Sequence, residues 1–126
     1  MTSSPVLGLP FIASQQSQPE VTHNTALLML QALQLGAEGQ QNSPPGSPTD
    51  GQVYVVGAAP TGAWAGRANC VAIWLGGWFF VPGFNSSGSP IAIGAAHEGL
   101  RVWRKDLDSL TVWDGTAWEV YPPLES

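Results

Sequence analysis

Charged residues are scarce in this sequence, and their scarcity limits what the protein can bind. They make up 10% of the 126 residues, against roughly 25% in an ordinary soluble domain. Four lysines and arginines stand against nine acidic residues, so the formal net charge is −5. Such a chain offers no stripe of cations that could neutralise several phosphates. We therefore expect no nucleic acid among its ligands.

Cysteine and long apolar runs are also scarce. The single cysteine, Cys70, has no partner for an internal disulfide and lies in an apolar run, where a buried and inert thiol is expected. The N-terminus lacks the basic segment of a secretion signal. The longest apolar stretch, residues 26–35, falls short of the ~20 residues that span a bilayer. We expect neither a secretion signal nor membrane insertion.

Residue clusters that could support catalysis are missing as well. His23 and His97 have no cluster of cysteines or carboxylates at metal-ligand spacing near them. Ser86, Ser87 and Ser89 lie among Gly, Asn and Pro, a composition typical of turns rather than of a nucleophile elbow. We expect no catalytic residue, no metal and no cofactor, and we rank an enzyme below a structural protein and a binding module.

One segment, residues 24–35, has a helical pattern. Asn24 is the predicted N-cap and Gly36 the residue that ends the helix. Apolar side chains surround most of this helix, so it should be buried on more than one side. We expect it to pack on its own sheet and on symmetry-related copies, although a central core helix in a monomer is the alternative. The predicted subunit interface consists of Leu27, Leu30 and Leu33.

The other segments predict an extended arm, a linker and a β module. Residues 1–23 hold three prolines around an apolar cluster, which suits an extended arm rather than a helix. Residues 36–51 are rich in Pro, Gly and Ser and predict a linker. Within residues 52–126 we expect strands at 52–56, 70–74, 78–81, 99–103, 110–113 and 118–121. The predicted fold is mainly β (α+β): an arm, one short apolar helix and one antiparallel meander sheet of five to seven strands.

Tryptophans flank the turns of two expected hairpins. Trp74 and Trp78 lie on either side of a glycine turn, and Trp113 and Trp118 lie on either side of another. Such pairs pack across the two strands and fix their register. We therefore expect a structural role for these four rings.

A further hairpin is expected between residues 99 and 113. A five-residue loop at 105–109 would put Trp103 and Trp113 on one exposed face, together with Arg101. That face would need a cover, and we favour a subunit or the helix over a glycan. Trp103 and Trp113 are nevertheless the candidate glycan-binding residues.

Four segments together resemble a known family. They are Leu7-Gly8-Leu9-Pro10-Phe11-Ile12, Val21-Thr22-His23-Asn24, residues 47–57 and Thr61-Gly62-Ala63-Trp64-Ala65-Gly66. Over residues 5–121 the sequence resembles a small uncharacterised domain family of tailed-phage and gene-transfer-agent virion proteins. In that family the domain commonly forms the N-terminal module of tail-fibre or head-spike proteins, which are generally trimers. The resemblance implies a virion role without enzymatic activity.

Pattern and resemblance together predict a homotrimeric structural protein of a tailed bacteriophage virion, made in the cytoplasm of the host bacterium. We expect a short fibre or fibre-attachment protein, and we expect no longer receptor-binding region after this module. The arm should anchor it to a tail, baseplate or capsid component, because an apolar arm between prolines has no evident place in its own sheet. The anchoring residues are Val6, Leu7, Leu9, Phe11 and Ile12. The alternative is a receptor-binding module for host-surface glycans.

Overall fold

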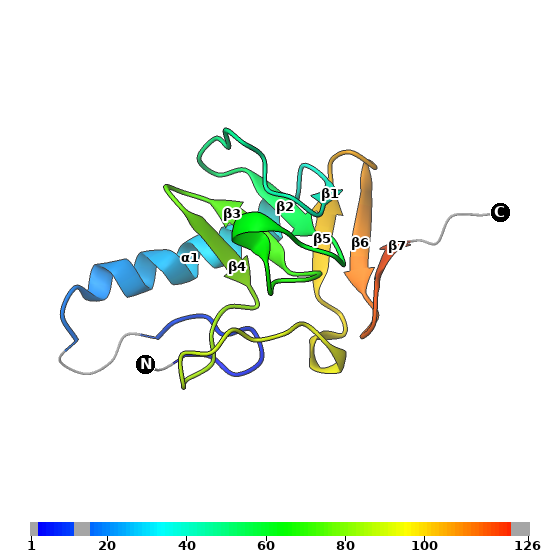
Figure 1. Ribbon diagram of the computed structural model, residues 1–126. Coiled ribbons are helices and arrows are strands. Elements are labelled where there is room, and N and C mark those ends of the chain that lie inside the picture. Colours follow the sequence, from blue (N-terminus) through cyan, green and yellow to red (C-terminus); the bar gives the residue numbers. More distant parts are fainter. Residues whose placement is uncertain (1–2, 12–15, 122–126) are drawn as a thin grey trace.

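The computed structural model describes residues 3–11 and 16–121 (Figure 1). It is mostly β, with one α-helix and two sheets of four and three strands. Within these residues no helix has both the length and the apolar character needed to cross a bilayer. The predicted mainly β class is confirmed, but the single meander sheet is wrong.

The helix α1 spans Pro19–Leu35, so it starts five residues before the predicted N-cap. Pro19 occupies the first turn, where its fixed φ angle favours a helix and its missing N–H costs nothing. His23 and Asn24 therefore lie on the exposed side of the helix and do not cap it. At the other end the prediction is confirmed, because the chain leaves the helix at Gly36, whose φ is 90°.

The first sheet has the strand order β1-β2-β3-β4. Its strands are β1 (Gln40–Gln41), β2 (Val53–Val56), β3 (Val71–Trp74) and β4 (Trp78–Val81). The strands β2, β3 and β4 pair antiparallel close to the predicted positions. The short β1 comes from the expected linker and pairs parallel to β2, which the sequence did not indicate.

The second sheet contains β5 (Arg101–Arg104), β6 (Ser109–Trp113) and β7 (Trp118–Tyr121), all antiparallel. Residues 82–100, which include the 3₁₀ turn η2 (Ala95–His97), separate it from β4. This long connection lets the chain start a new sheet instead of continuing the first one. Both tryptophan hairpins form as predicted: Trp74 pairs with Trp78 and Trp113 with Trp118, with ring centroids 5.1 and 5.5 Å apart.

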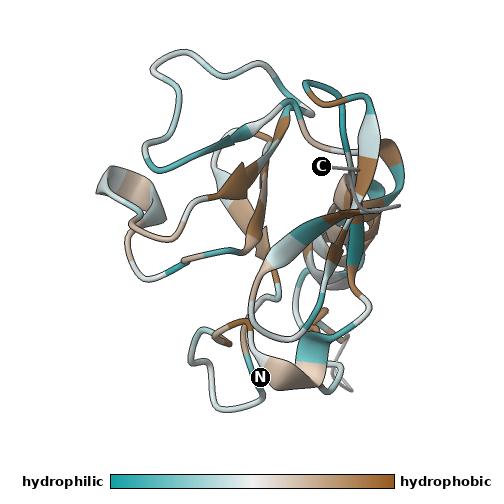
Figure 2. Ribbon diagram, turned by 90° about the vertical axis from the view of Figure 1, so that its right-hand side faces the viewer, coloured by the Kyte–Doolittle hydropathy of each residue, from teal (hydrophilic) through white to brown (hydrophobic). Residues whose placement is uncertain are grey.

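The helix joins the two sheets. It contacts β3 and β4 of the first sheet and β5 of the second (Figure 1). Figure 2 shows hydrophobic residues on the strands beside it. The main core consists of Met29, Ala32, Ala37, Val53, Val55, Val71, Ile73, Val81 and Val102. Both sheets therefore contribute to the main core.

The opposite face of the first sheet has a smaller core around Trp64. This residue ends the 3₁₀ turn η1 (Gly62–Trp64) and is fully buried. Its ring lies 5.9 Å from Tyr54 and 5.1 Å from Trp78, measured between ring centroids. The segment 57–66 therefore supplies the cover of this face.

The N-terminal segment is a folded loop and not an extended arm. Ser3 pairs with Pro10 in an antiparallel bridge, and the amide of Ser4 donates to the carbonyl of Leu9 at 2.7 Å. Leu7 and Leu9 pack against the main core. The prediction of an extended arm is wrong, because both leucines pack within their own domain. Ile12 lies outside the described residues.

The loop is held in place by residues far along the chain. The amide of Gly83 donates to the carbonyl of Leu7 at 2.7 Å, and Nε2 of His97 lies 2.9 Å from the carbonyl oxygen of Val6. Gly83 is required there, because a Cβ atom on it would lie 2.6 Å from the carbonyl oxygen of Gly8. Val6 and Phe11 remain about half exposed, at 48% and 51%.

Candidate assembly surface

The outer face of the second sheet carries two rows of side chains, one of them apolar and the other with a charged residue at each end. The backbone register aligns one residue from each strand in each row. The rows are Arg101, Val112 and Glu119, and Trp103, Leu110 and Tyr121. Trp103 is 41% exposed and Tyr121 is 62% exposed, whereas Leu110 and Val112 are half-buried. A sheet face of this composition is an expected site of protein contact.

The inner face of the same sheet is buried. Trp113 is only 2% exposed, and its Nε1 donates to the carbonyl of Gly94 at 2.8 Å. Trp118 follows on β7 and donates from its Nε1 to the carbonyl of Asn69, also at 2.8 Å. Indole N–H groups that are buried need such acceptors. These bonds attach the second sheet to the loops around the first.

The predicted face shared by Trp103, Trp113 and Arg101 is therefore wrong. The β5–β6 loop has four residues, 105–108, and Arg104 pairs with Ser109. Because side chains alternate along a strand, one residue fewer in the loop moves every side chain of β6 to the opposite face. Trp113 points inward and Trp103 outward, so the candidate glycan-binding pair does not form.

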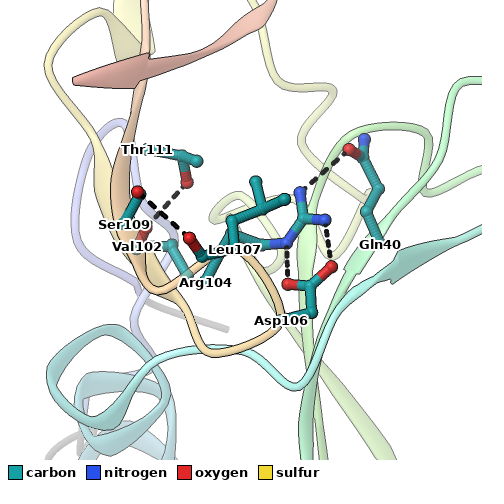
Figure 3. Close-up of polar contacts among 7 residues, drawn as sticks. All are labelled: Gln40, Val102, Arg104, Asp106, Leu107, Ser109 and Thr111. Atoms are coloured by element: carbon teal, nitrogen blue, oxygen red, sulfur yellow. Dashed lines mark hydrogen bonds and ion pairs between the residues drawn. The ribbon is translucent and has the colours of Figure 1, made fainter. Parts of the chain in front are cut away.

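Polar contacts of Arg104 hold this register (Figure 3). Its guanidinium donates to both carboxylate oxygens of Asp106 at 2.8 and 2.7 Å, and to Oε1 of Gln40 on β1 at 3.2 Å. The hydroxyl of Thr111 donates to the carbonyl of Val102 at 2.7 Å. Hydrogen bonds from Arg104 lower the pKa of Asp106 below its ordinary value. A buried arginine with a bidentate partner thus closes the β5–β6 loop and links the two sheets.

The predicted interface residues of α1 separate into two groups. Leu27 and Leu30 are 51% and 44% exposed and lie on the solvent side of the helix. Leu33 is half-buried and packs against the main core. It also lines a groove of about 570 Å³, together with Gln34, Arg101, Trp103 and Leu110. This groove connects the end of the helix to the outer sheet face.

A second groove, of about 360 Å³, lies between the first half of α1 and β4. Val21, Met29 and Phe79 line it, among other apolar side chains. Nearby, the guanidinium of Arg67 lies 4.7 Å from the ring centroids of both Phe80 and Phe84. Arg67 also donates to the carbonyls of Pro82 and Gly83. Burial lowers the pKa of Arg67, and its contacts hold the chain where it leaves β4.

Groups that could take part in chemistry are engaged in the fold. His97 is 6% exposed; its Nδ1 accepts from the amide of Gly94 at 3.1 Å, and its Nε2 faces the carbonyl of Val6. Cys70 is buried, and burial raises the pKa of its thiol to about 11. In residues 3–11 and 16–121, no three His, Cys, Asp or Glu side chains are placed to hold a metal ion. The face best placed for an external partner is the outer face of the second sheet.

Comparison with known proteins gives a family and no function. No curated protein and no solved structure matches the chain. A family described as "Protein of unknown function (DUF2793)" matches residues 23–119, which include most of α1, the strands β1 to β6, the start of β7 and the whole outer face except Tyr121. This match covers most of the sequence. The chain therefore belongs to the DUF2793 family.

Proposed function

We propose that this protein is a structural component of a tailed-phage virion, a short fibre or fibre-attachment protein that acts as a homotrimer. The observation that carries the proposal is the outer face of β5, β6 and β7, where Trp103 and Tyr121 lie exposed beside aliphatic residues. A chain with only 10% charged residues has little charge to keep such a face in water. Contact with other copies would cover it.

The virion context rests on the resemblance of the Thr22-His23-Asn24 and Thr61-Gly62-Ala63-Trp64-Ala65-Gly66 segments to phage and gene-transfer-agent proteins. The contribution of Trp64 to the core is consistent with a structural role for the second segment. In this proposal the protein is made in the host cytoplasm, has no enzymatic activity and resides in the particle.

The solution mass of the purified chain tests self-association directly. Light scattering over a range of protein concentrations should give a mass near three chains. A mass of one chain at all concentrations would contradict the homotrimer. A stable mass of two chains would contradict the trimer while retaining self-association.

The N-terminal loop is the proposed contact with a tail, baseplate or capsid component. Leu7 and Leu9 belong to the core, so the exposed Val6 and Phe11 are the apolar side chains that a neighbour could bind. This assignment replaces the set of five anchoring residues predicted from the sequence. It is supported by the hydrogen bonds to Leu7 and Val6, which hold the loop in one shape before any partner arrives.

The anchoring role can be tested with the substitution Val6→Asn. Val6 has a φ of 71°, a region that Asn tolerates better than a β-branched residue, so the variant should fold. We expect it to form trimers but to be lost from purified particles. Leu75→Asn, at a turn residue that is 50% exposed, is the matched control and should be incorporated normally. Normal incorporation of the Val6 variant would contradict the role of Val6.

The alternative, a receptor-binding module for host-surface glycans, loses its main argument. It depended on two neighbouring exposed tryptophans, and Trp113 is buried. Trp103 alone provides one ring beside Arg101. Binding of the purified protein to a glycan array would restore this alternative.

A further inference from the structure

We propose that the outer faces of three second sheets meet around a common axis as a three-sided prism, in which Arg101 of each copy pairs with Glu119 of the next. This inference deepens the proposed homotrimer and depends on it. It names the sheet face, not the predicted leucines of α1, as the centre of the interface.

The order of residues across the face fits such a prism. In both rows the residue on the central strand β6 is aliphatic, Val112 in one row and Leu110 in the other. These side chains would fill the axis. The outer strands carry the residues that would meet a neighbouring copy, so the edge strand β7 of one copy lies beside β5 of the next.

Charge complementarity identifies the partner as a second copy of this chain. Arg101 and Glu119 lie in the same row with β6 between them, a separation of roughly 10 Å at the usual strand spacing. The salt bridges in the described part of the chain are Arg104–Asp106 and Lys105–Glu38, so neither Arg101 nor Glu119 forms a salt bridge within its own protomer. In a closed ring each Arg101 meets a Glu119, and no like charges are brought together.

The second row supports the same arrangement. Trp103 and Tyr121 occupy the two flanks, and both are strongly exposed in a single copy. When β7 of one copy lies beside β5 of the next, the Tyr121 ring faces the groove lined by Trp103, Leu33 and Gln34. Aromatic rings in such a position contribute much of the energy of a protein interface. In this arrangement the Tyr121 ring of a neighbouring copy fills the groove.

Charge reversal tests the pairing. Arg101→Glu and Glu119→Arg should each shift the trimer-to-monomer transition to at least about ten times higher protein concentration, and the double variant should bring it back toward the wild-type value. Asp50→Arg, an equal charge change at an exposed loop residue, is the control and should leave the transition in place. Circular dichroism checks that each variant is folded.

The outcomes separate this inference from the function on which it rests. If the wild type is a trimer but both single variants behave like the Asp50 control, the prism is wrong and the homotrimer stands. If the double variant does not recover, the direct pairing of Arg101 with Glu119 is wrong. If the wild type is a monomer, both proposals fall.

Cross-linking provides a second measurement, which tests which residues of two copies lie close together and is made at a protein concentration where the variants associate. Arg101→Cys protomers would be mixed with Glu119→Cys protomers and treated with a short bifunctional maleimide. Linked pairs should form faster in this mixture than in either variant alone. Because each protomer carries one new thiol and Cys70 is buried, a linked pair requires contact between copies. Equal linking in the mixture and in the separate variants would overturn the proposed arrangement.

Discussion

Arg104 shows how one buried charge can decide local structure. Its side chain is 10% exposed and donates two hydrogen bonds to Asp106, two residues further along the chain. Desolvation of a guanidinium is tolerated only when its donors are satisfied. The pair therefore favours the short loop that gives the second sheet its register.

The first prediction concerns Asp106→Asn. This substitution should lower the free energy of unfolding at pH 7 by only about 1 kcal/mol, because the carboxylate is partly exposed and its pairing with Arg104 is weakened by water. The pKa of Asp106 is lowered in the folded state, so its stabilising effect is present above the unfolded pKa and is lost as the pH falls through the folded pKa. Urea unfolding of both proteins at a series of pH values from 7 downward measures this. A difference in the free energy of unfolding that does not decrease as the pH falls below about 4, the ordinary pKa of Asp, would contradict the assignment to the carboxylate.

The second prediction concerns the thiol of Cys70. Burial raises its pKa to about 11, with Arg67 acting in the opposite direction, so almost no thiolate is present at pH 8. We expect no reaction with a disulfide reagent in the native protein at pH 8 and complete reaction of one thiol in urea. Rapid labelling of the folded protein would show that the 70–74 strand region opens easily.

At the scale of elements, the third prediction concerns the 3₁₀ turn η1. Trp64 is fully buried, and its Nε1 has no hydrogen-bond partner among the residues described. Trp64→Ala should cost about 3–5 kcal/mol of stability because it leaves a cavity over the first sheet. Trp64→Phe should cost clearly less, since it keeps a ring and removes the unpaired N–H. Denaturation midpoints of the two variants provide the comparison, and equal losses would contradict the packing argument.

The two tryptophan hairpins and the wrongly predicted register of β5 and β6 show how much of the strand arrangement could be predicted from the sequence. The tryptophan pairs at 74/78 and 113/118 were predictable, because flanking aromatics and a turn specify a hairpin locally. The faces of β6 were not, because they depend on whether Ser109 belongs to the loop or the strand, and Ser109 pairs with Arg104. Arg101 and Trp103 could therefore be assigned to one face from the sequence, but Glu119 could be assigned to that face only from the observed pairing.

At the scale of the whole molecule, the largest errors concern contacts distant in sequence. The N-terminal loop meets Gly83 and His97, and Ala37 forms a bridge with Arg104. None of these contacts has a periodic pattern that could be found along the sequence. Pro19 is different, because its position at the first turn could have placed the start of α1 correctly.

The fourth prediction follows from the position of α1 between the two sheets. A chain ending at residue 99 lacks β5, which packs on the helix and contributes Val102 to the main core. We expect it to lose cooperative thermal unfolding, although all four strands of the first sheet are present. A sharp transition in this truncated chain would show that the first sheet and α1 form an independent unit.

The position of α1 between the two sheets also determines when the protein can fold during synthesis. Translation releases α1 early, but the strand that completes its cover begins only at Arg101, and the partner of Val6 is His97. The nascent chain therefore carries α1 without its complete cover until β5 has been made. The three strands of the second sheet that complete the fold also bear the outer sheet face. One segment of the chain thus supplies both the last part of the core and the proposed surface for contact between copies.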